Sequence, residues 1–102
     1  AEKQFKAEAR RNKLLGLWAA DCMGMTSSEG KAYAREIVRI DITEPGVGDI
    51  IRKVLADAKN RNVVIGEDEI RKQLERLYAI ALEQIAGDYP EPLGPDHERV
   101  GD

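Results

Sequence analysis

The sequence predicts an all-α fold, a four-helix bundle with a long N-terminal helix and a disordered C-terminal tail. Apolar residues recur at helical spacing in four segments, and no stretch alternates long enough to indicate a β-strand. Glycine and proline separate these segments at positions where helices commonly end. A chain of 102 residues has room for one domain with a modest core. We therefore expect a helical domain over residues 1–87 and a separate tail over residues 88–102.

The first predicted helix runs from about Glu2 to Met23 and has two unlike halves. Its second half carries an apolar stripe that comprises Leu14, Leu15, Leu17, Trp18, Cys22 and Met25. Its first half is polar on nearly every side, so we expect it to lie outside the core and to need a partner. Gly16 lowers the helix propensity and marks either close helix packing or a hinge. Because free cysteine is usually buried, we expect Cys22 to be an inert thiol of the core.

The second predicted helix begins near Ser27, where Thr26 and Glu29 have the spacing of a capping box. It stops at the turn formed by residues 44–46, because proline disfavours a helical residue before it. A third helix follows, with an apolar stripe formed by Ile50, Ile51, Val54, Leu55 and Ala58. The next connection, residues 60–66, contains three aliphatic residues that we expect to fold as a small lid over one end of the core.

The fourth predicted helix opens with three acidic residues, which suit the positive end of a helix dipole. The residues that we expect it to bury are Ile70, Leu74, Leu77, Tyr78, Ala81 and Ile85. Gly87 is its predicted C-terminal stop. The remaining tail contains three prolines and five acidic residues with few apolar ones, a composition typical of disordered segments.

Charge is distributed unevenly along the chain, although the net charge is only -3. Residues 1–15 contain five bases and two acids, whereas residues 87–102 contain five acids and one base. The overall balance gives no attraction to nucleic acid, and no apolar run is long enough to cross a bilayer or to form a signal-peptide core. A single cysteine forms no internal disulfide and fits a reducing compartment. We expect a soluble cytoplasmic protein with no direct membrane insertion.

The sequence offers no recognisable catalytic, metal or cofactor site. The only histidine, His97, lies in the predicted tail far from Cys22, so a Cys-His pair is not expected. The glycines around Val47 do not form a phosphate-binding loop, because the Lys-Ser/Thr of that motif is missing. We predict a binding protein rather than an enzyme, with no cofactor and no metal. A small bundle enzyme or an adenine-nucleotide-binding bundle is the more distant alternative.

Residues 4–20 read QFKAEARRNKLLGLWAA and resemble the signature of the zeta subunit family, which inhibits the F-type ATP synthase of alphaproteobacteria. Weaker matches occur at residues 32–36, 44–53 and 69–71, so that the resemblance covers roughly residues 1–85. It implies a four-helix regulatory protein that binds the alpha, beta and gamma subunits of the catalytic head and is peripheral to the inner membrane. Family members carry further residues before the position of Ala1, which form the main inhibitory stretch. We therefore expect weak inhibition by this chain.

The resemblance implies that the polar first half of the first helix binds the catalytic head. We expect Lys3, Phe5, Lys6, Arg10 and Arg11 to lie nearest the catalytic interface, with the bases steering association and the aromatic ring anchoring it. A solvated helix face is the alternative interpretation of these charges. A generic helical adaptor is the second hypothesis for the whole protein, and weak adenine-nucleotide binding stays open beside it.

Overall fold

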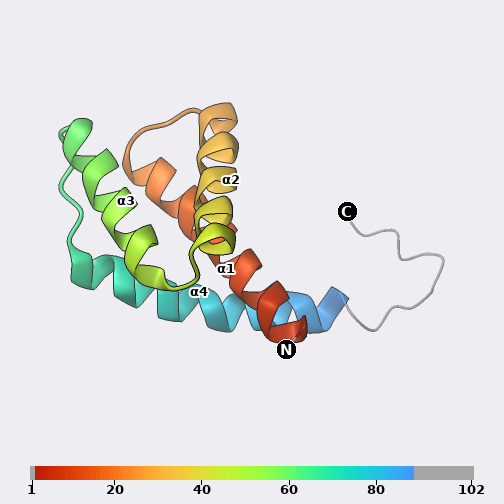
Figure 1. The fold of residues 1–102 in the computed structure, drawn as a ribbon. Helices are drawn as coiled ribbons and strands as arrows, with labels where there is room; N and C mark the ends of the chain where they lie inside the picture. The colour runs from red at the N-terminus through yellow and green to blue at the C-terminus, as the bar shows by residue number, and fades with distance from the viewer. Residues whose placement is uncertain (1, 89–102) are drawn as a thin grey trace.

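The structure is a computed structural model that describes residues 2–88. Within this range it contains four helices and no strand: α1 (Glu2–Cys22), α2 (Ser27–Thr43), α3 (Val47–Asn60) and α4 (Glu67–Asp88) (Figure 1). The predicted all-α, four-helix architecture is confirmed. Helix α4 continues through Gly87, the predicted stop, and ends one residue later. The predicted disordered tail lies outside the described residues, apart from Asp88.

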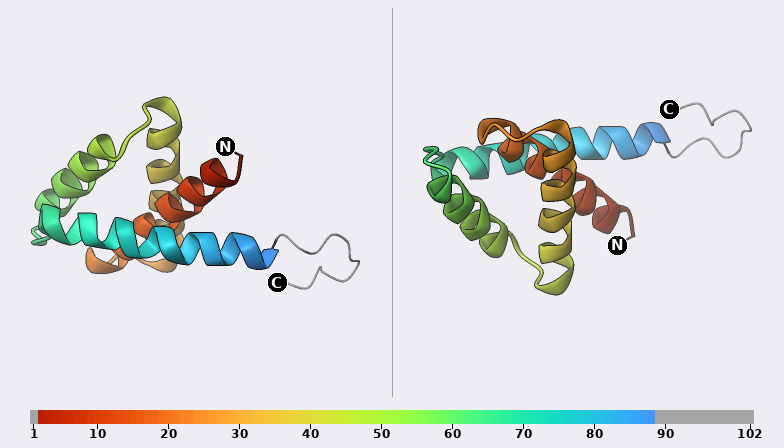
Figure 2. Two further views of the ribbon diagram at one scale, coloured as in Figure 1. Left: turned by 90° about the horizontal axis from the view of Figure 1, so that it is seen from below. Right: turned by 90° about the horizontal axis from the view of Figure 1, so that it is seen from above.

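Helix α1 is the central packing element. It makes its most extensive contacts with α2 and then with α4, while α3 makes smaller contacts with α2 and α4. Figure 2 shows that the N-terminal end of α1 and the C-terminal end of α4 lie at the same end of the molecule. At this end of the molecule, Arg10 of α1 donates a hydrogen bond to Gln84 of α4.

The connection between α1 and α2 follows the predicted capping signal. Gly24 adopts a positive φ of 75°, which lets the chain turn sharply after α1. Thr26 Oγ1 accepts a hydrogen bond from the backbone N–H of Glu29 at 3.1 Å, and the Thr26 N–H donates to the Glu29 carboxylate at 2.9 Å. The predicted capping box is confirmed. The backbone hydrogen bond from Thr26 lowers the pKa of the Glu29 carboxyl group.

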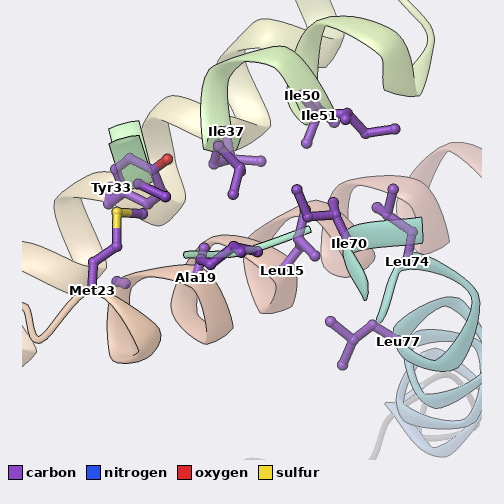
Figure 3. Packing of buried hydrophobic residues seen from close by; sticks show 14 residues of the cluster. Leu15, Ala19, Met23, Tyr33, Ile37, Ile50, Ile51, Ile70, Leu74 and Leu77 are labelled. Carbon is purple, nitrogen blue, oxygen red and sulfur yellow. The ribbon is translucent and has the colours of Figure 1, made fainter. Parts of the chain in front are cut away.

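Aliphatic side chains from all four helices meet in one core (Figure 3). Its largest fully buried apolar side chains are Leu15, Ile37, Ile50, Val54 and Ile70. Figure 3 shows Leu15 of α1 pointing toward the side chains that α3 and α4 contribute. The apolar stripes predicted for α3 and α4 therefore face the same interior, although Tyr78 is only half-buried.

A polar network closes one side of this core between α2 and α3. The Tyr33 hydroxyl donates to Asp57 Oδ2 at 2.8 Å, and Lys53 Nζ lies 3.0 Å from the same oxygen and 3.2 Å from Glu36 Oε1. Burial and the Asp57 carboxylate raise the pKa of Tyr33 far above its ordinary value. Burial opposes the charge of Lys53, but its two carboxylate partners raise the pKa of the amine overall.

The expected burial of Cys22 is wrong, and the expected lid after α3 is only partly formed. Cys22 is exposed, because the core-facing row of α1 passes through Ala19, Ala20 and Met23 instead. Partial burial and the nearby Glu69 and Asp21 carboxylates raise the pKa of its thiol. The connection 61–66 is only partly a lid, since Val64 is 97% exposed while Ile65 is buried.

The first half of α1 also departs from its expected position outside the core. Ala7 and Asn12 are fully buried. The Asn12 Oδ1 atom accepts a hydrogen bond from Arg11 Nε at 2.9 Å. Its Nδ2 has no hydrogen-bond acceptor among residues 2–88.

Candidate partner-binding surface

The first two turns of α1 present the most exposed aromatic ring of the described chain. Phe5 is 58% exposed, and Lys3 and Lys6 beside it are also exposed. Lys6 Nζ lies 3.7 Å from Glu2 Oε2, a surface pair that adds little stability. An exposed phenyl ring between lysines gives this end of α1 both an apolar anchor and positive charge.

Arg10 connects this end of α1 to α4. Its Nη1 donates to Gln84 Oε1 at 2.7 Å, and the side chain is half-buried. The two helices and α2 enclose a groove of about 450 Å³, the N-terminal groove, lined by Phe5, Lys6, Ala9, Arg10, Lys13, Val38 and Ile85. Three of the five predicted site residues therefore share one groove.

Arg11 belongs to a different side of α1. Consecutive helical residues point about 100° apart, so Arg10 and Arg11 cannot both face the N-terminal groove. The Arg11 guanidinium lies over the ring of Tyr78, with 5.8 Å between Cζ and the ring centroid. It lines a separate depression with Val47 and residues of the first turns of α4. The predicted five-residue cluster is thus split, and Lys3 lines neither groove.

A second groove continues from the first between α1 and α2. This α1–α2 groove, of about 690 Å³, is lined by Lys13, Leu17, Lys31, Ala34, Arg35, Val38, Arg39 and Ile42. Lys13 and Val38 line both grooves, which makes them one continuous surface that we call the basic face. Six bases line it, and no described acidic residue does.

Sequence reasoning missed the α2 half of the basic face. The signal was present, because Lys31, Arg35 and Arg39 are spaced by four residues and must lie on one side of a helix. The sequence did not predict that these α2 bases lie beside the bases of α1, because their proximity depends on how the two helices cross. Gly16 and Ala34 permit that close crossing, since a Cβ on Gly16 would lie 2.6 Å from the Ala34 Cα atom.

Other kinds of site find no support in the part of the chain that the structure describes. No three His, Cys, Asp or Glu side chains there are grouped so that they could hold a metal ion. None of the four described helices combines the length and apolar character that crossing a bilayer requires.

Comparison with known proteins agrees with this description. One solved structure, titled only as the solution NMR structure of a protein, superimposes with a TM-score of 0.73 at 46% sequence identity. The match covers 83% of this chain and 96% of that one. No curated protein matches the sequence. The profile of the family described as ATPase inhibitor subunit zeta matches residues 1–84, nearly the whole helical part, and the chain therefore belongs to that family.

Proposed function

We propose that this chain binds the catalytic head of the F-type ATP synthase and inhibits ATP hydrolysis through the N-terminal turns of α1. Family membership makes the protein a regulatory, inhibitor-type component associated with ATP synthase. The finer proposal concerns the surface that acts and the subunits that it contacts. We assign those subunits as alpha, beta and gamma of the head, so that the protein is peripheral to the membrane through the synthase.

The observation that carries the proposal is the position of Phe5. Burying a large apolar side chain stabilises a protein by about 1.5–3 kcal/mol, yet this ring is 58% exposed at the tip of a helix. Aromatic residues that become buried at an interface commonly dominate its binding energy. Phe5 is therefore the anchor, and Lys3 and Lys6 supply charge that accelerates and orients association.

The rest of the bundle holds this anchor in place. Arg10 ties α1 to Gln84 of α4, and Ala7 is fully buried beneath the same turns. The N-terminal turns are consequently a supported arm rather than a free peptide, which reduces the conformational entropy lost on binding. A supported arm inserted between head subunits would oppose the conformational changes that hydrolysis requires.

The direct test is to titrate ATP hydrolysis by a purified alphaproteobacterial catalytic head with this chain while measuring binding in the same mixtures. The expected result is a partial loss of turnover that follows occupancy, in keeping with the weak inhibition expected of this chain. A generic helical adaptor would bind the head, or some other protein, without changing turnover. Binding with unchanged turnover would therefore support the adaptor and overturn the inhibitor.

A further inference from the structure

The basic face contains a row of positive charge that the described chain leaves unneutralised. Lys31, Arg35 and Arg39 follow one another at intervals of four on α2, a spacing at which like charges repel. None of these three bases has an ion-pair partner within residues 2–88. A row of this kind is stabilised by an anionic segment laid along it.

Apolar side chains form the floor of the same surface. Leu17 and Val38 are only half-buried where α1 and α2 meet, and Ile42 is 61% exposed at one edge. With Phe5 at the other edge, the basic face includes two of the three large hydrophobic residues that are strongly exposed in the described chain. Its occupant should therefore combine acidic residues with a few apolar ones.

The C-terminal segment, residues 88–102, has this composition. Its acidic residues are Asp88, Glu91, Asp96, Glu98 and Asp102, against the single base Arg99. Its apolar residues are Tyr89, Leu93 and Val100, spread among the acids. Three prolines oppose helix formation and favour extended backbone, which suits a peptide that lies along a groove.

Helix α4 brings this segment to the edge of the basic face. Ile85 lines the N-terminal groove, and Gln84 accepts the hydrogen bond from Arg10 within it. The 14 residues after Asp88 would span about 43 Å in polyproline II geometry, at about 3.1 Å per residue. The longest dimension of the described molecule is 47 Å, so this length is ample to follow both grooves.

We propose that residues 88–102 bind intramolecularly along the basic face, with their acidic side chains on the α1 and α2 bases and their apolar side chains on the Leu17–Val38 floor. The family profile matches residues 1–84, and the proposed contact uses residues beyond that match. The docked segment would compete with the ATP synthase head for Lys6 and Arg10, a consequence that rests on the proposed function. The docking itself does not depend on it.

Paramagnetic broadening in the full chain tests the contact. A nitroxide is attached at Gly94→Cys in a Cys22→Ser background, and the loss of amide peak intensity is measured on dilute, isotope-labelled protein. We expect selective loss at the amides of Lys13, Arg35 and Val38, while amides of α3, such as Ala56, retain their intensity. Raising the ionic strength to about 1 M, where the Debye length is about 3 Å, should remove most of the selectivity.

Charge reversal provides matched controls. Arg35→Glu with Arg39→Glu should abolish the selective broadening, whereas Lys59→Glu with Arg76→Glu, which changes the net charge equally on other exposed positions, should leave it intact. Adding Glu91→Lys and Glu98→Lys to the Arg35→Glu, Arg39→Glu variant should restore the selective broadening. All six substituted positions lie on the described surface or in the tail, and circular dichroism checks that each variant remains helical.

Two results would overturn the proposal. One is broadening that is confined to the amides nearest the end of α4 and leaves Arg35 unaffected, or that spreads over all four helices, because both patterns indicate an unattached tail. The other is equally strong broadening when spin-labelled and isotope-labelled chains are separate molecules in a mixture, because the groove would then bind another copy. The experiment contains no ATP synthase, so its failure is distinct from failure of the proposed function.

Discussion

Gly16 of α1 packs directly against the backbone of Ala34 of α2. A methyl group added to Gly16 would lie 2.6 Å from the Ala34 Cα atom and 3.1 Å from its Cβ. Backbone cannot move aside as a flexible side chain does, so the contact fixes how closely the two helices cross. It also places Lys13 and Leu17 of α1 opposite the basic row of α2.

Replacing Gly16 with alanine should destabilise the protein, despite the better helix propensity of alanine. The propensity gain is at most about 1 kcal/mol, whereas overpacking a tight contact costs about 1–3 kcal/mol. We expect a net loss of about 1 kcal/mol in the free energy of unfolding, measured by urea denaturation. The control is Gly87→Ala, where no heavy atom lies within 4 Å of the added methyl group and stability should hold or rise. Equal effects of the two substitutions would contradict the close crossing.

The buried amide of Asn12 should lower the stability of the bundle. Its Nδ2 has no acceptor among the described residues, and an unsatisfied buried donor costs about 1–3 kcal/mol. Asn12→Leu keeps a similar volume and removes that donor, so the free energy of unfolding should stay level or rise by about 1 kcal/mol. Thermal and urea unfolding would measure the change. A loss of stability would show that the amide makes a favourable interaction in this position.

The stability of the fold should decrease at alkaline pH because of the raised pKa of Tyr33. Its pKa is raised in the folded state by burial and by its hydrogen bond to Asp57, so above about pH 10 the unfolded chain loses the phenolic proton that the folded chain retains. The folded state then binds more protons, and the free energy of unfolding decreases as pH rises. Lys53, whose pKa is also raised, adds to the same trend.

Tyr33→Phe tests this assignment of the pH dependence. The variant should be less stable than the wild type by about 0.5–1.5 kcal/mol at neutral pH, because it lacks the hydrogen bond to Asp57. Between about pH 9 and about pH 11 its stability should decline less steeply. Parallel declines in urea unfolding experiments would rule out Tyr33 as the source.

The capping box should contribute measurably to α2. Thr26→Ala removes the acceptor for the Glu29 N–H and should cost about 1 kcal/mol in the free energy of unfolding. Ser28→Ala changes a neighbouring exposed hydroxyl outside the box and serves as the control. A similar cost for both would place the stabilisation elsewhere in the first turn.

Local signals in the sequence were sufficient to predict the helices. The Thr26–Glu29 box, the turn at residues 44–46 and the acids at the start of α4 each act within a few residues, and all of them fall where helices begin or end. Burial near the helix ends depended on tertiary packing. Cys22 fits the apolar stripe by spacing, yet it is exposed because Ala19 and Met23 take the core-facing positions.

The candidate site was predictable only on one helix. The bases and the aromatic ring near the start of α1 were evident from their order in the chain, and helix geometry alone separates Arg10 from Arg11. Their contacts with Gln84 and Tyr78 required the position of α4. Predicting that Arg35 and Arg39 belong to the same surface would have required knowledge of the close helix crossing at Gly16. Residues distant in sequence form a surface through packing geometry, and a single sequence does not display that geometry.

The most direct test of the proposed inhibitory role measures the inhibition of ATP hydrolysis by the wild type and by two matched double variants. Lys3→Glu with Phe5→Ala removes the proposed anchor and reverses one charge, while Arg76→Glu with Val64→Ala makes the same kinds of change at exposed positions on α4 and in the connection before it. We predict that the first variant needs about tenfold more protein for half-inhibition, which corresponds to about 1.4 kcal/mol, and that the second matches the wild type. Equal inhibition by all three proteins, or none by the wild type, would contradict the claim that the N-terminal turns of α1 inhibit the head.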